Sequence, residues 1–288
     1  MAKVHHRYAT IDGHRLFYRE AGPRDAPAVL LLHGFPTSSS MFRHLIPALA
    51  DDYRVIAPDH LGFGLSDAPS AAEFGYTFDA LAGLTARLLE ELGVDRYAMY
   101  VQDYGAPIGW RLALARPANV TAIISQNGNA YEQGFVQDFW KTVWAYHASG
   151  DDADIRGFLT LEATQWQYLT GVPDETLVDP EAATHDYALL SRPGNDDVQL
   201  ALFRDYATNP PLYPEVQAYF RASHVPVLAV WGRGDPIFGP EGAAAFAQDV
   251  PHAEIHLLDG GHFLLESALD EVAPLIRTFL ANHVSVAM

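Results

Sequence analysis

The stretch of sequence that decides the fold reads Tyr97-Ala98-Met99-Tyr100-Val101-Gln102-Asp103-Tyr104-Gly105-Ala106. Its first five residues form a short apolar run, which is typical of a strand that is covered on both faces of a sheet. From Gly105 to Ala115 the pattern is helical, and it begins with two small residues. The stretch therefore predicts a buried strand, a sharp turn that carries Asp103, and a helix.

The same alternation of strand and helix continues on both sides of this stretch. Further strands are predicted at residues 28–32, 53–57, 120–124, 225–231 and 254–258, and helices at about 41–50, 78–92 and 266–282. Near the start of the chain, the turn pair Asp12-Gly13 joins two alternating segments and predicts an antiparallel hairpin. Repeated βαβ units predict an α/β fold with a mostly parallel central sheet flanked by helices.

The alternation stops between residues 129 and 213, where aromatic residues are concentrated. We interpret this segment as an inserted helical cap, because the strand pattern returns after it. The core is then expected to comprise residues 1–128 and 214–288.

Composition limits the partners of the chain. Its 288 residues include 18 Lys and Arg against 36 Asp and Glu, and the formal net charge is −18. Such a field repels nucleic acids and anionic lipid, so we expect neither a nucleic acid nor a membrane partner. No run is long and apolar enough to cross a membrane, and the chain has no cysteine, which together favour a cytoplasmic protein. We expect a monomer or homodimer that uses no metal or other cofactor. A small, neutral, apolar substrate is the natural inference.

Three polar residues that can perform chemistry follow predicted strands. Asp103 follows the strand at 97–101, Asp235 the strand at 225–231, and His262 the strand at 254–258. The carboxyl ends of parallel strands meet at one edge of a sheet, where ligands bind. No G-x-S-x-G motif is present, so a serine nucleophile is disfavoured. The order along the chain is instead a carboxylate nucleophile, an acid and a histidine.

On these residues the chain resembles the aspartate-nucleophile branch of the α/β-hydrolase superfamily, which contains epoxide hydrolases and haloalkane dehalogenases. The matching segments are His33-Gly34-Phe35-Pro36, Asp59-His60-Leu61-Gly62-Phe63-Gly64-Leu65-Ser66-Asp67, Gln102-Asp103-Tyr104-Gly105, Gly234-Asp235 and Gly261-His262-Phe263. One departure is Val101, which stands where the family usually has glycine. The resemblance implies an α/β-hydrolase fold.

The resemblance also implies a two-step hydrolysis. Asp103 would attack an electrophilic carbon and form an alkyl-enzyme ester, which water activated by His262 would hydrolyse. Asp235 would orient His262. The backbone amides of Phe35 and Tyr104 would form the oxyanion hole.

His33 has a different implied role. It lies in the segment that carries Phe35, and it would support the oxyanion loop without exchanging protons.

The substrate depends on how the leaving group is stabilised. Dehalogenases of the family usually carry tryptophan after the nucleophile and a second halide donor, but Tyr104 and Phe35 stand at those places. Epoxide hydrolases use two cap tyrosines, for which Tyr146 and Tyr206 are candidates by their spacing. A shift of one turn would place Phe203 where Tyr206 is expected, and these rings could equally line an apolar pocket.

Other details resemble the dehalogenases more closely, among them Gln102, Pro36-Thr37-Ser38-Ser39 and Phe263-Leu264-Leu265-Glu266. We therefore predict a hydrolase that opens an epoxide to a diol, with a haloalkane dehalogenase as the alternative. A hypothesis from another class is an α/β-hydrolase-fold protein that only binds a small hydrophobic ligand.

Overall fold

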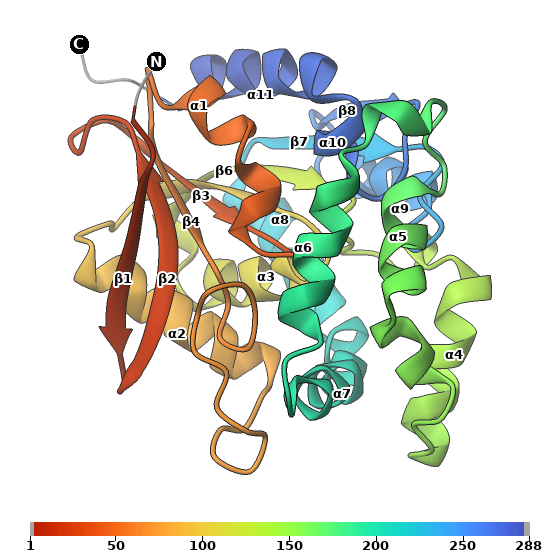
Figure 1. Cartoon of the computed structure of the whole chain (residues 1–288). Helices are drawn as coiled ribbons and strands as arrows, with labels where there is room; N and C mark the ends of the chain where they lie inside the picture. The colour runs from red at the N-terminus through yellow and green to blue at the C-terminus, as the bar shows by residue number, and fades with distance from the viewer. Residues whose placement is uncertain (1–2, 285–288) are drawn as a thin grey trace.

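The computed structural model describes residues 3–284 and contains an eight-stranded sheet in the order β1-β2-β4-β3-β5-β6-β7-β8 (Figure 1). The strands are β1 His5–Ile11, β2 His14–Ala21, β3 Ala28–Leu32, β4 Arg54–Pro58, β5 Tyr97–Val101, β6 Val120–Gln126, β7 Val227–Gly232 and β8 Glu254–Leu258. Strand β2 pairs antiparallel with both β1 and β4, and all other pairs are parallel. The predicted fold class is confirmed.

The helices connect these strands. They are α1 Leu45–Leu49, α2 Phe78–Glu91, α3 Gly105–Ala115, α4 Gln137–Ser149, α5 Leu161–Leu169, α6 Pro180–Leu190, α7 Asn195–Asp205, α8 Tyr213–Ser223, α9 Pro240–Ala245, α10 Leu264–Ser267 and α11 Leu269–His283. Among residues 3–284, no helix has both the length and the apolar character needed to cross a membrane.

Helices cover both faces of the sheet because successive strand residues point to opposite sides. On β3, Leu30 and Leu32 pack in the cluster that includes α2, α3 and α8. The intervening Val29 and Leu31 pack in a second cluster, with α1 and α11. Figure 1 shows α1 and α11 together on one side of the sheet. This two-sided burial explains why the strand appears in the sequence as an uninterrupted apolar run.

Two predicted helices differ from the structure. The helix expected at about 41–50 is a 3-10 turn, Ser39–Phe42, followed by the short helix α1. Pro47 accounts for the break, because it has no N–H to donate to a preceding turn. The closing helix expected at 266–282 is divided at Ala268 into α10 and α11. The Asp12-Gly13 hairpin is present, with positive φ at both residues.

Residues 129–213, here called the interposed segment, contain α4, α5, α6 and α7 and lie outside the sheet (Figure 1). The chain leaves β6 before this segment and returns to β7 after α8, and β6 and β7 are neighbours in the sheet. Residues 1–2 and 285–288 of the predicted core lie outside the described residues.

Candidate active site

Asp103 lies in a sharp turn between β5 and α3. Its φ is +48°, a left-handed conformation that non-glycine residues rarely adopt. Helix α3 begins immediately after Tyr104, and a Cβ on Gly105 would lie 2.1 Å from the carbonyl oxygen of Leu32 in β3. Only glycine fits this close approach. The turn therefore raises the Asp103 side chain above the carboxyl edge of the sheet.

The carboxylate of Asp103 is held by two backbone amides. The N–H of Phe35 and the N–H of Tyr104 each donate to Oδ1 at 2.6 Å. Gly34 brings the Phe35 loop close, since a Cβ at Gly34 would lie 2.3 Å from the Cβ of Asp103. Two charge-assisted hydrogen bonds on one oxygen leave Oδ2 as the oxygen that is free to react.

His262 faces Oδ2 of Asp103 from the loop after β8. Its Nε2 lies 3.8 Å from Asp103 Oδ2, and its Nδ1 lies 2.8 Å from Asp235 Oδ2. Because a carboxylate can only accept, Nδ1 carries the proton and Nε2 keeps its lone pair on the side of Asp103. The structure thus brings together the three residues expected at the strand ends, and His262 is fully buried.

Asp235 accepts hydrogen bonds at both oxygens. The amide of Asn127 donates to Oδ2 at 2.7 Å, and the N–H of Ile237 donates to Oδ1 at 2.7 Å. Asn127 also accepts from the N–H of Gly232 at 2.9 Å. These bonds fix the carboxylate in the plane that His262 requires.

The sequence analysis missed Asn127 and gave Gln102 no role. Asn127 directly follows β6, so a search for polar residues at every strand end would have found it. The side-chain nitrogen of Gln102 lies 2.8 Å from His262 Nε2, and its oxygen is buried without a partner. Gln102 therefore contacts the lone pair with which His262 would accept a proton.

Burial and charge oppose each other at this site. Burial raises the pKa of Asp103, while the charge of His262 and the amides of Phe35 and Tyr104 lower it without cancelling the rise. At His262, burial lowers the pKa, but the charge and hydrogen bond of Asp235 outweigh it and the net direction is upward. Asp235 is therefore the main group that holds the pKa of His262 above its ordinary value.

His33 supports the loop that carries Phe35. Its Nδ1 donates to the carbonyl of Gly34 at 3.0 Å, and its Nε2 accepts the N–H of His60 at 3.1 Å. Burial lowers the pKa of His33 to about 4 and lowers that of His60 well below its ordinary value. Both rings are therefore neutral at physiological pH.

The aromatic residues of the interposed segment approach the site unequally. The ring of Phe203 lies 5.1 Å from that of Phe35, and the ring of Tyr206 lies 6.0 Å from that of Tyr104. Burial raises the pKa of Tyr206, and the charge of Asp103 is among the smaller causes. The hydroxyl of Tyr104 is buried without a partner.

Tyr146 makes its contacts within the interposed segment. Its hydroxyl donates to the carbonyl of Leu200 at 3.3 Å, and the guanidinium of Arg204 lies 5.2 Å from the centre of its ring. The structure therefore brings Tyr206 to the site and gives Tyr146 a packing position.

The N–H groups of three buried tryptophans already donate hydrogen bonds to backbone carbonyls. Trp140 donates to the carbonyl of Ile237 at 2.9 Å, Trp110 donates to that of Asn129 at 2.9 Å, and Trp231 donates to that of Phe238 at 2.8 Å. An indole ring carries only one hydrogen-bond donor, its N–H group. These three tryptophans cannot hold a halide without breaking a buried hydrogen bond.

Comparison with known proteins places this geometry in a family. A model of the α/β-hydrolase fold family matches residues 27–269. The chain belongs to the α/β-hydrolase fold family. This membership agrees with the resemblance seen in the sequence.

Two curated relatives and one solved structure locate the chain within the α/β-hydrolase fold family. An uncharacterized hydrolase from Saccharomyces cerevisiae is 43% identical, over 96% of this chain and 97% of that protein. Haloalkane dehalogenase 2 from Mycobacterium tuberculosis is 30% identical, over 91% and 90%. The crystal structure of an epoxide hydrolase from Vigna radiata shares the fold, with a TM-score of 0.77, 24% identity and coverage of 97% and 98%. The protein is a hydrolase of the α/β-hydrolase type that is related to haloalkane dehalogenases and shares its fold with an epoxide hydrolase.

Proposed function

We propose that the protein is an epoxide hydrolase that uses Asp103 as its nucleophile. This proposal rests on the different surroundings of the two oxygens of the Asp103 carboxylate. Oδ1 accepts both backbone amides, and Oδ2 lies 3.8 Å from His262 without such a bond. This arrangement supplies a free nucleophilic oxygen and a ready oxyanion hole on one side chain.

In the first step, Oδ2 of Asp103 attacks an epoxide carbon and the C–O bond of the ring breaks. The electron pair goes to the epoxide oxygen, and the alkoxide takes a proton from the hydroxyl of Tyr206. The product of this step is an ester between Asp103 and the opened substrate.

In the second step, Nε2 of His262 takes a proton from water, and the hydroxide attacks the Asp103 carboxyl carbon. Negative charge develops on Oδ1, where the amides of Phe35 and Tyr104 already point. The ester bond between the carboxyl carbon and Oδ2 breaks, and the leaving alkoxide takes the proton of the carboxylic acid that forms, so the diol leaves and Asp103 is again a carboxylate. The proton on His262 returns through solvent to Tyr206. Asp235 stabilises the imidazolium between these events.

The preference for an epoxide over a haloalkane follows from the available donors. An alkoxide must receive a proton, whereas a halide needs only hydrogen bonds. Hydroxyls can transfer a proton, and the charge of Asp103 acts on two buried tyrosines, Tyr104 and Tyr206. The Tyr104 hydroxyl has no partner, whereas that of Tyr206 donates to Tyr213 and would turn from it to the substrate. The three buried indoles are committed to carbonyls. Of the two tyrosines expected as donors, we retain Tyr206, and we propose Tyr104 in place of Tyr146.

We further propose that the interposed segment is a cap that closes over a small, neutral, apolar substrate. The contacts of Phe203 and Tyr206 with Phe35 and Tyr104 support this role. Water is the second substrate. We place the reaction in the cytoplasm and infer a monomer or homodimer.

The test is intact-mass analysis of His262→Gln after separate exposure to epoxides and to haloalkanes. The first step needs no base, so we expect an adduct with the whole mass of the epoxide. Asp103→Asn is the matched control and should remain unmodified.

A second candidate, a haloalkane dehalogenase, rests on the 30% identity with the Mycobacterium tuberculosis enzyme. It predicts that the same experiment finds an added mass equal to that of the haloalkane less HX. The mechanism is wrong if neither epoxides nor haloalkanes modify His262→Gln and the unaltered protein hydrolyses neither class. That result would favour the hypothesis that the protein only binds a small hydrophobic ligand.

A further inference from the structure

A groove of about 770 Å³ lies on the interposed segment, and its lining includes none of the residues assigned to the candidate active site. Its walls come from α4, from the 3-10 turn Ile155–Leu159 and from α5. Pro236, which directly follows Asp235, also lines it. The groove therefore extends from the surface of the segment to the loop that carries a residue of the active site.

Parallel aromatic rings form the apolar part of this groove. The rings of Phe139 and Phe158 are 4.6 Å apart with an angle of 8° between their planes. Trp166 lies parallel to Phe139, at 6.2 Å and 4°, and 41% of its surface is exposed. Phe139 and Phe158 are half-buried, so the groove has one exposed and two partly exposed rings, and an apolar concave surface of this kind is typical of a site that binds apolar ligands.

The ring of Phe158 connects the groove to the packed aromatic residues beside the nucleophile. It lies 6.0 Å from Phe203, which lies 5.1 Å from Phe35. The N–H of Phe35 in turn binds Asp103. A chain of aromatic contacts thus joins the groove to the reactive carboxylate.

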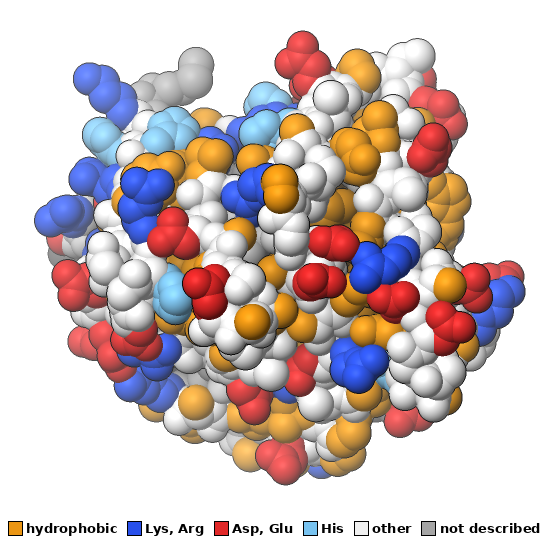
Figure 2. All heavy atoms as spheres, turned by 60° about the horizontal axis from the view of Figure 1, so that its bottom comes forward, with side chains coloured by type: hydrophobic (Ala, Val, Ile, Leu, Met, Phe, Trp, Pro, Cys, Tyr) orange, Lys and Arg blue, Asp and Glu red, His pale blue; other side chains and the backbone are white. Residues whose placement is uncertain are grey.

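Carboxylates surround the groove. Asp138, Asp154 and Glu162 line it, and none of its described lining residues is Lys or Arg. The two nearby cations are already paired, Lys141 with Asp138 at 3.2 Å and Arg156 with Asp152 at 2.9 Å. Figure 2 shows one face of the molecule, on which acidic and basic side chains are interspersed with hydrophobic ones.

We propose that this groove is an outer binding site for the long substituent of the substrate, and that it selects neutral or cationic apolar chains over chains that end in a carboxylate. The inference rests on the proposed function and names the substrate class. The reactive carbon would lie at Asp103 while the chain lies along Phe158, Phe139 and Trp166. A terminal carboxylate would then lie near the like charges of Asp154 and Glu162, while the charge of Asp138 is offset by Lys141.

The first test uses terminal epoxides that share one chain length and differ at the far end. With a carboxamide end, we expect kcat/KM to be about three- to tenfold higher than with a carboxylate end, and an ammonium end should do at least as well. The difference should shrink as salt is added, because the charges are near the surface. A short epoxide without a chain serves as the reference.

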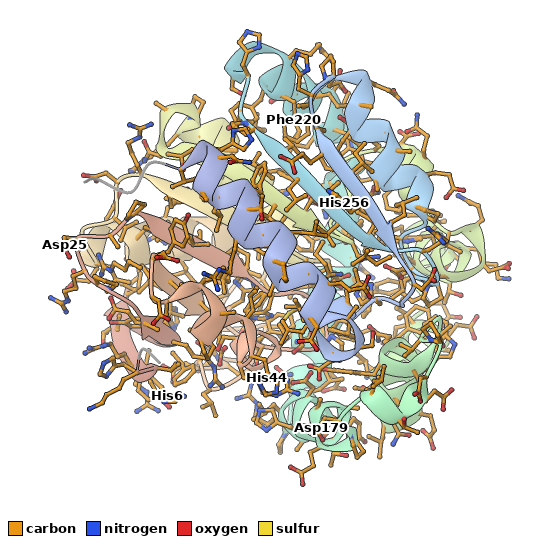
Figure 3. The ribbon with its side chains drawn as sticks, turned by 90° about the horizontal axis from the view of Figure 1, so that it is seen from above. His6, Asp25, His44, Asp179, Phe220 and His256 are labelled. Atoms are coloured by element: carbon orange, nitrogen blue, oxygen red, sulfur yellow. The ribbon has the colours of Figure 1, made fainter. Side chains whose placement is uncertain are left out.

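Matched variants assign the effect to the groove. Asp154→Asn with Glu162→Gln should at least halve the carboxamide-to-carboxylate ratio and leave the short epoxide unchanged. Asp25→Asn with Asp95→Asn is the control, since these exposed residues line a recess elsewhere. Figure 3 shows Asp25 on the opposite side of the molecule from the helices of the interposed segment.

The apolar wall has its own matched pair. Trp166→Ala should raise KM about fivefold for the long carboxamide epoxide and not for the short one. Leu177→Ala, at an exposed residue of the same segment, should change neither value.

Binding of unreactive analogues separates this proposal from the proposed function. Calorimetric titration with a long-chain carboxamide and its matching carboxylate should show the same preference and the same loss in the Asp154→Asn with Glu162→Gln variant. If no epoxide is turned over but this preference is found, only the proposed function fails. Equal binding of the two ligands, or an equal change in the Asp25→Asn with Asp95→Asn control, would overturn the outer binding site.

Discussion

The strand ends and the interposed segment both border Asp103, but they hold their functional groups by different means. At the strand ends, hydrogen bonds fix the polar atoms, as with Asp235 between Asn127 and Ile237. In the interposed segment, Phe203 and Tyr206 are held mainly by contacts between rings. Ring packing tolerates rotation and exchange of side chains better than a saturated hydrogen-bond network does. From this difference we expect substitutions at the strand ends to alter the reaction more than substitutions in the segment do.

The largest expected effect comes from Asp103→Asn. The substitution preserves the shape of the side chain and removes the nucleophilic charge, so we expect kcat to fall by about 10⁴-fold or more. Initial rates with an epoxide measure this, and an unchanged melting temperature shows that the fold is intact. Residual activity above a few per cent of the unaltered protein would show that another group attacks the substrate.

Asp235→Asn tests the orientation of His262. An amide at this position can donate and would favour the wrong tautomer, so we expect kcat to fall by about 10³- to 10⁴-fold. The charge of Asp235 also raises the pKa of His262. Its loss should lower that pKa, and the acid limb of the pH–rate profile should move to lower pH. An acid limb that stays in place or moves upward would contradict His262 as the base.

The burial of His33 makes the free energy of unfolding depend on pH. The folded protein holds the pKa of His33 at about 4, whereas the unfolded chain has the ordinary value of about 6.5. Below pH 6.5 the unfolded chain therefore binds a proton that the folded protein excludes. The free energy of unfolding should fall by about 3 kcal/mol from this residue between pH 6.5 and 4.

Urea unfolding at several pH values measures this dependence, and His33→Gln provides the reference because the other titrations are shared, apart from that of His60, whose pKa His33 also lowers. The difference in slope between the two proteins should vanish above pH 7. Parallel curves throughout the range would refute the claim that His33 stays neutral in the fold.

The interposed segment yields the smallest effects. Tyr206→Phe removes a proton donor and should lower kcat for an epoxide by about 10²-fold. Tyr146→Phe is the matched control, since its hydroxyl binds the carbonyl of Leu200, and kcat should change less than about threefold. Rapid-mixing measurements of ester formation place the loss in the first step. Equal losses in both variants would indicate that the two tyrosines act only through packing.

The sequence predicted the strand ends well because their signals are local. The run at 97–101 matches β5 to the residue, and Gly105 begins α3 as expected. Since parallel strands end at a common edge, the positions of Asp103, Asp235 and His262 along the chain were enough to predict that they meet. Asn127 obeys the same rule and was overlooked.

The interposed segment was less predictable for a physical reason. The direction of a tyrosine hydroxyl depends on how its helix packs against others, and spacing along the chain does not encode that packing. Tyr146 and Tyr206 have similar claims by spacing, yet one binds the carbonyl of Leu200 and the other lies beside Tyr104. The roles of both residues stay predictions until the variants are measured.

The adjacency of β6 and β7 has a consequence for the history of the protein. Residues Ile123 and Val227 pair in register although the whole interposed segment lies between them in the chain. The two strands stay neighbours whatever length of polypeptide connects them, so an ancestor could have gained, lost or exchanged that connection without shifting the sheet. Selection could thus diversify the compounds that descendants accept while inheriting one unaltered reaction centre.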